Sequence, residues 1–81
     1  MALAFQPISL DVESGDSAGL LVLRDGALVA VVAELSAMHG EIAGWWFIEA
    51  AFHPAVPNRH DPFPDIAALD RWLRAQMMPL G

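Results

Sequence analysis

The chain has 81 residues, no cysteine and a formal net charge of −6, because ten acidic residues face four arginines and there is no lysine. This length predicts one domain over residues 1–81 with a small core, since such domains bury only about 60–65% of their unfolded surface. The acidic balance disfavours nucleic acid and anionic membranes as partners. Without cysteine, neither disulfides nor thiolate metal sites are available.

The N-terminal residues predict no targeting segment. Met1–Pro7 lack a basic region followed by a long apolar stretch, which a secretory signal requires. The longest apolar block is interrupted at 24–26, well short of the roughly 18–20 apolar residues of a transmembrane helix. We therefore expect a cytoplasmic protein, and alanine and arginine without lysine fit a GC-rich bacterial coding sequence.

A first strand is predicted from Leu3 to Val12, where apolar and polar residues alternate loosely. Pro7 lies inside this run and therefore favours an edge position or a bulge, because proline cannot donate a ladder hydrogen bond. A polar turn follows at residues 13–17.

The run from Ala18 to Leu35 predicts a hairpin that turns at Asp25-Gly26. A two-residue type I′ turn pairs Arg24 with Ala27, and strand alternation then defines two faces. One face carries Leu20, Val22, Ala27, Val29, Val31, Ala33 and Leu35, and the other carries Leu21, Leu23, Leu28, Ala30 and Val32, with Glu34 towards the end. Both faces are apolar, and a domain of this size cannot cover both.

Residues 36–44 contain two glycines and predict a loop or one helical turn, and 45–52 are dense in aromatic and branched residues typical of a strand. The row expected to face the core is Trp46, Ile48, Ala50 and Phe52, and the other row is Trp45, Phe47, Glu49 and Ala51. The segment 54–64 holds four prolines and is predicted to be a loop that supports neither a ladder nor a helix.

The last element is predicted to be a helix. Asp61 is the expected N-cap, with Pro62 at the first helical position, and Pro79 is expected to end the helix. The apolar stripe consists of Ile66, Leu69, Leu73 and Met77, flanked by Trp72. The predicted class is therefore α+β: a small antiparallel sheet of three to four strands with one C-terminal helix packed on one face, in β-β-β-β-α order.

The leading functional hypothesis is a non-catalytic interaction or regulatory module. A sheet that is apolar on both faces with one helix to cover it favours a homodimer, joined through the uncovered face or through an edge strand. The interface candidates are Trp45, Phe47, Val29 and Val31. Another protein, such as a toxin or enzyme that an acidic domain neutralises, is the further option.

The alternative hypothesis is a small-ligand or metal-binding protein, including an enzyme, that uses the histidine loops. Its candidate residues are His39, Glu41, His53 and His60, because imidazole and carboxylate are ordinary ligands of zinc and non-haem iron. The spacing matches no metal motif, and no cofactor is predicted. Glu34 and Glu49 are further acid–base candidates, and no Gly-x-Ser-x-Gly elbow is present.

Overall fold

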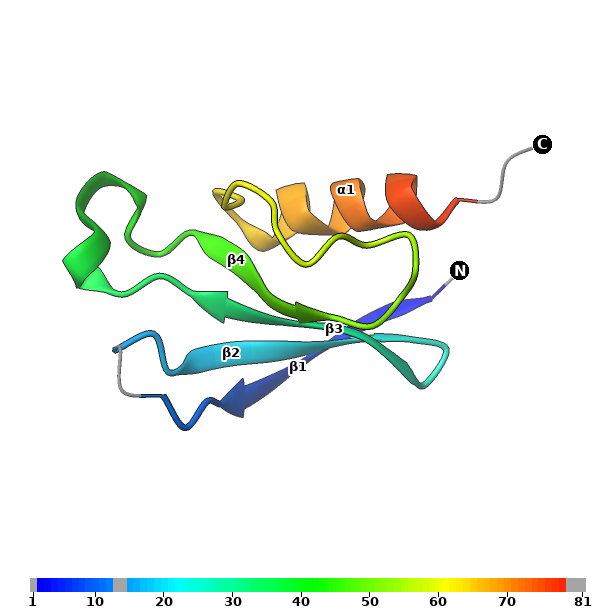
Figure 1. The fold of residues 1–81 in the computed structure, drawn as a ribbon, viewed down its shortest axis with the longest axis horizontal. Helices are drawn as coiled ribbons and strands as arrows, with labels where there is room; N and C mark the ends of the chain where they lie inside the picture. The colour runs from blue at the N-terminus through cyan, green and yellow to red at the C-terminus, as the bar shows by residue number, and fades with distance from the viewer. Residues whose placement is uncertain (1, 13–14, 79–81) are drawn as a thin grey trace.

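The computed structural model describes residues 2–12 and 15–78 and has an α+β architecture in β-β-β-β-α order, as predicted (Figure 1). Its elements are β1 (Leu3–Ser9), β2 (Ala18–Arg24), β3 (Ala27–Glu34), the 3-10 helix η1 (Ala37–Ile42), β4 (Trp46–Ala51) and α1 (Ile66–Met77). The four strands form one antiparallel sheet in the order β1-β2-β3-β4. α1 and the connection after β4 lie on one face of this sheet. The predicted turn at 13–17 and the predicted stop at Pro79 fall partly or wholly outside the described residues.

The hairpin turn between β2 and β3 is confirmed. Asp25 has a φ of 50° and Gly26 a φ of 88°, the positive values that a type I′ turn requires. Arg24 pairs with Ala27 and Leu23 with Leu28. The local turn chemistry therefore determines the register of the first two residue pairs.

The predicted register is wrong beyond these pairs, because β3 contains a bulge at Val29. Val22 pairs with Ala30 instead of Val29, and Leu20 pairs with Val32. An extra residue in one strand shifts the pairing by one, and since side chains alternate with a period of two, every later side chain of β3 changes face. The face towards α1 carries Leu20, Val22, Ala30 and Val32, and the opposite face carries Leu21, Leu23, Leu28, Val31 and Ala33.

A second bulge lies in β4 at Glu49. Val32 pairs with Ile48 but Val31 pairs with Ala50, so that Glu49 is the extra residue. Trp46 and Ile48 face the core as predicted. Beyond the bulge the predicted rows are wrong: Ala51, not Ala50, packs against the core, and Phe52 is 60% exposed.

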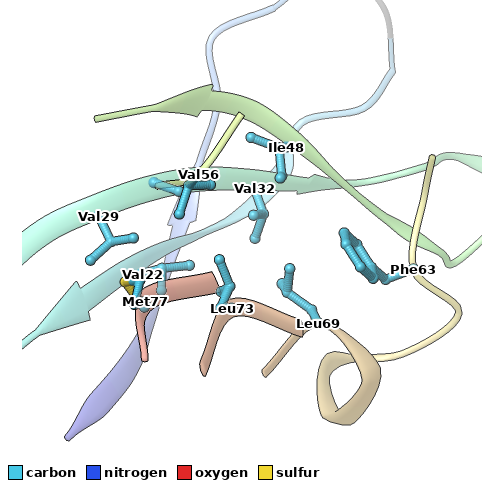
Figure 2. Packing of buried hydrophobic residues seen from close by; sticks show 10 residues of the cluster. Val22, Val29, Val32, Ile48, Val56, Phe63, Leu69, Leu73 and Met77 are labelled. Carbon is cyan, nitrogen blue, oxygen red and sulfur yellow. The ribbon is translucent and has the colours of Figure 1, made fainter. Parts of the chain in front are cut away.

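The hydrophobic core lies between the sheet and α1 (Figure 2). Its buried members are Val22, Val29, Ala30, Val32 and Ile48 from the sheet, Val56 and Phe63 from the connection, and Leu69, Leu73 and Met77 from the helix. Val29 is 2% exposed. Its prediction as an interface residue is therefore wrong: its side chain lies on the same side of the sheet as Val22, where the protein's own helix covers it.

The connection between β4 and α1 is a loop, but it supports one ladder rung, contrary to prediction. Trp46 N donates to Phe63 O at 2.8 Å and Phe63 N donates to Trp46 O at 2.7 Å. Ala51 N donates to Asn58 Oδ1 at 2.9 Å. These bonds use backbone groups on the outer edge of β4, so the loop covers that edge of the sheet.

The helix begins one turn later than predicted. Asp65, not Asp61, is the N-cap, and its carboxylate accepts a hydrogen bond from Ala68 N at 2.8 Å. Pro62 therefore lies before the helix, where the 60–64 segment bends towards Trp46 to form the bridge. The pairing of Phe63 with β4 outweighs the local preference for a proline-initiated first turn.

We expect Leu69→Ala to lower the free energy of unfolding by about 2–5 kcal/mol, because a fully buried leucine leaves a cavity between α1 and the sheet. Urea denaturation followed by tryptophan fluorescence measures this loss. Gln76→Ala on the exposed side of α1 is the control and should change stability by less than about 0.5 kcal/mol. Equal effects at both positions would contradict this placement of the core.

Candidate functional site

The first candidate site is a hollow at the end of the sheet opposite the Asp25-Gly26 turn. Asp16 lies two residues before the start of β2 and Ser36 lies two residues after the end of β3, and the antiparallel pairing of these strands brings the two residues together. Ser36 N donates to Asp16 Oδ1 at 2.8 Å, and His39 Nε2 on η1 lies 3.1 Å from Asp16 Oδ2. Asp16 thus ties the start of η1 to the start of β2.

The environment of Asp16 favours its charged form. The residue is only 8% exposed, and it is the buried charged residue of the described chain. The hydrogen bond from the Ser36 backbone holds the pKa of this carboxyl below its ordinary value of 3.8, desolvation opposes that shift, and the Ser36 hydroxyl and His39 add smaller lowering effects. The carboxylate is therefore retained in a sheltered position by its hydrogen bonds.

The contact with Asp16 also determines the chemistry that His39 offers. An ionised carboxylate only accepts hydrogen bonds, so the contact requires a proton on His39 Nε2, and in the neutral form of the ring Nδ1 is then an acceptor. The hollow beside this pair has a volume of about 270 Å³ and is lined by Asp16, Ser36, Met38 and His39. Met38 is 88% exposed and forms its apolar wall.

The other two histidines lie in separate surroundings. His53 Nε2 lies 3.3 Å from Arg24 at the turn end of β2, while its Nδ1 accepts from Ala55 N at 3.0 Å. His60 stacks on Phe63, with 4.7 Å between ring centroids, and contacts Trp72. The two His53 contacts require opposite tautomers of a neutral ring, so only one of them is a hydrogen bond at a time.

The structure does not bring the predicted metal-ligating residues together. His39 and His53 lie near opposite ends of β2, which at seven residues is about 20 Å long. Glu41 is exposed on η1 and does not line the hollow. Within residues 2–12 and 15–78, no group of three histidine, cysteine or acidic residues is placed to hold a metal ion. The predicted convergence of the histidine loops is therefore wrong, because the sheet separates them.

Sequence reasoning missed Asp16, which it treated as part of a polar turn. No local signal distinguishes this residue from its neighbours, since its partners Ser36 and His39 lie 20 and 23 residues away. The remaining acid–base candidates do not join the pair: Glu34 is half-buried at the end of β3, and Glu49 is exposed in the bulge of β4.

The second candidate site is the face of the sheet away from α1, which we call the open face. It carries two predicted interface residues, Val31 and Phe47, and strand alternation places Trp45 on the same side. The partly exposed apolar side chains of its strands are Ile8, Leu21, Leu23, Val31, Phe47 and Ala50, with Leu28 at 40% exposure. Ala33 and Leu35 are buried on this side, outside the core cluster. The open face therefore presents partly exposed apolar side chains from all four strands, while the chain itself covers Ala33 and Leu35.

In comparisons with known proteins, no protein-family model, curated protein or solved structure matches the chain. In the described part of the chain, no helix has both the length and the apolar character needed to cross a membrane.

The lowered pKa of Asp16 predicts a pH-dependent contribution to stability. Because the folded-state pKa lies below the unfolded one, the contribution is present above about pH 5 and is lost as the pH falls through 3.8 towards the folded-state value. We therefore expect Asp16→Asn to be less stable than the wild type at pH 7, and the difference to shrink at pH 3. Urea denaturation at both pH values tests this.

The matched control for this experiment is Glu41→Gln, which neutralises an exposed carboxylate on the neighbouring 3-10 helix. Its stability relative to the wild type should vary little between the two pH values. A stability difference for Asp16→Asn that stays constant with pH would show that the charge of Asp16 does not stabilise the fold.

Proposed function

We propose that this protein is a small self-associating interaction module of the cytoplasm that forms a homodimer through the open face. The observation that carries the proposal is the uncovered sheet face itself, where apolar side chains from all four strands lie partly exposed. Isolated surface leucines are ordinary, but contiguous apolar patches mark interaction sites. A second copy is a fitting partner because the same surface on two molecules is self-complementary about a two-fold axis.

The edge of β4 supports association through the face rather than through this edge. The bridge between Trp46 and Phe63 and the bond from Ala51 to Asn58 already use backbone groups that a new strand would need. An additional strand would have to displace the connection and lose Phe63 from the core. The sheet is therefore protected on this side.

The edge of β1 is protected by Pro7. The bonds from Asp25 N to Ala2 O and from Leu10 N to Ser17 O show that even-numbered residues pair with β2. Hydrogen-bonded and non-bonded pairs alternate in an antiparallel ladder, so the odd-numbered residues direct their backbone groups outward. Pro7 has no N–H at such an outward position, and any long strand pairing here would lose a bond near its centre.

The size of the open face sets the expected strength of the dimer. Four strands about 4.8 Å apart and about 20 Å long present roughly 400 Å² in projection. A standard stable interface covers about 800 Å² per partner. The proposed dimer is therefore in the weak, reversible class and its population depends on protein concentration. Two stacked sheets about 10 Å apart would form its core.

We expect light scattering after size exclusion to show a mass that rises from 8.8 kDa towards twice that value as the protein concentration increases. Val31→Glu places a carboxylate on the open face and should keep the mass at that of a monomer, because burying an unpaired charge costs more than the apolar contact returns. Trp45→Glu should act in the same direction. Near-UV circular dichroism checks that both variants stay folded.

The control for these variants is Ala75→Glu, which adds the same charge on the exposed side of α1 and should leave the concentration dependence of the mass unchanged. A wild-type protein that stays monomeric at every concentration would contradict the proposed dimer. So would a folded Val31→Glu variant that associates as the wild type does.

The variant Pro7→Ala distinguishes a dimer joined through the open face from one joined through the edge of β1. The substitution restores an outward N–H on β1, so an edge-joined dimer would become tighter, whereas a dimer joined through the open face should keep its dissociation constant within about twofold. Sedimentation equilibrium of the wild type and the variant measures this. A clear gain in affinity for Pro7→Ala would overturn the face-mediated arrangement in favour of an edge.

A further inference from the structure

The hollow beside Asp16 presents hydrogen-bond acceptors next to an apolar wall. The Asp16 side chain is 10% exposed, and its carboxylate interacts with Ser36 N, the Ser36 hydroxyl and His39 Nε2, which leaves one of its roughly four lone-pair positions for a further donor. In its neutral form His39 adds Nδ1 as an acceptor, because the contact with Asp16 requires the proton on Nε2. Met38 contributes a flexible thioether side chain at the rim.

These features select a ligand that donates hydrogen bonds and carries positive charge. The Coulomb attraction between a sheltered carboxylate and a cation is larger than that of an exposed pair, because the surrounding protein screens it less than water does. The net charge of −6 favours the approach of cations to the molecule as a whole. An anionic ligand would meet a carboxylate without a neighbouring lysine or arginine among the lining residues.

We propose that the hollow formed by Asp16, Ser36, Met38 and His39 is a binding site for an aliphatic primary ammonium group. The ammonium donates to the Asp16 carboxylate and to His39 Nδ1, and the alkyl chain lies along Met38, whose unbranched side chain adapts to apolar ligands. This site is distinct from the open face and does not require the dimer.

The volume limits the size of the ligand. At about 270 Å³ the hollow is slightly smaller than the roughly 300–1,000 Å³ of sites that hold drug-sized molecules. An alkylammonium of about five heavy atoms fits this space, and a ligand of that size binds with a dissociation constant of roughly millimolar order. The length of the ligand's alkyl chain should then affect the binding affinity only through its contact with Met38.

The test is an NMR titration of the full chain with n-butylammonium chloride at constant ionic strength, following the Ser36 amide and the His39 ring. Saturable shifts at both residues are expected, and n-butanol, which has the same chain without the charge, should give shifts that remain far from saturation. Equal binding of butanol and butylammonium, or no saturation by either, would overturn the proposal.

Two variants test the roles of the residues. Asp16→Asn removes the charge and should weaken butylammonium binding at least tenfold, whereas the matched control Glu41→Gln should bind as the wild type does. Met38→Ala changes an exposed side chain outside the core, and it should weaken the binding of butylammonium more than that of methylammonium. Butylammonium binding that is unchanged in folded Asp16→Asn, or equally weakened in Glu41→Gln, would show non-specific attraction to an acidic protein. The mass measurements on the open-face variants test the dimer separately, so neither outcome of the ammonium titrations changes their interpretation.

Discussion

The bulge at Val29 is the constraint on which the rest of the structure depends. Strand side chains alternate, so the extra residue decides which side chains of β3 meet α1 and which form the open face. The second bulge, at Glu49, repeats the shift in β4 and keeps Ile48 and Ala51 on the core side with Val32 and Ala30. Without these two bulges, a different set of side chains from β3 and β4 would face the helix.

The result is a sheet with unequal faces built from similar residues. On one face, Leu69 and Leu73 of α1 pack against branched side chains of β2, β3 and β4. On the other, leucine, valine and phenylalanine remain partly exposed. Phe63 and Asn58 cover the edge of β4 and Pro7 interrupts that of β1, which supports the association that we propose through the open face rather than through an edge.

The buried carboxylate of Asp16 organises the far end of the sheet in a different way. Its bonds to Ser36 and His39 hold η1 against the start of β2 and at the same time determine the tautomer of the imidazole. The Asp16 carboxylate therefore both stabilises this end of the sheet and forms part of the candidate ligand site. A charge that stabilises the fold through its hydrogen bonds also leaves a lone pair for an incoming cation.

The sequence by itself determined the features that depend on neighbouring residues: the Asp25-Gly26 turn, the spacing of Leu69 and Leu73 in the helix, and the order of strands and helix. Only the tertiary structure decided the bulges, the N-cap at Asp65 and the partners of Asp16. A bulge is placed by the combined pairing and burial of both strands, and a shift of one residue reverses every face beyond it. The contacts of Asp16 join residues 20 or more positions apart, which no local pattern encodes.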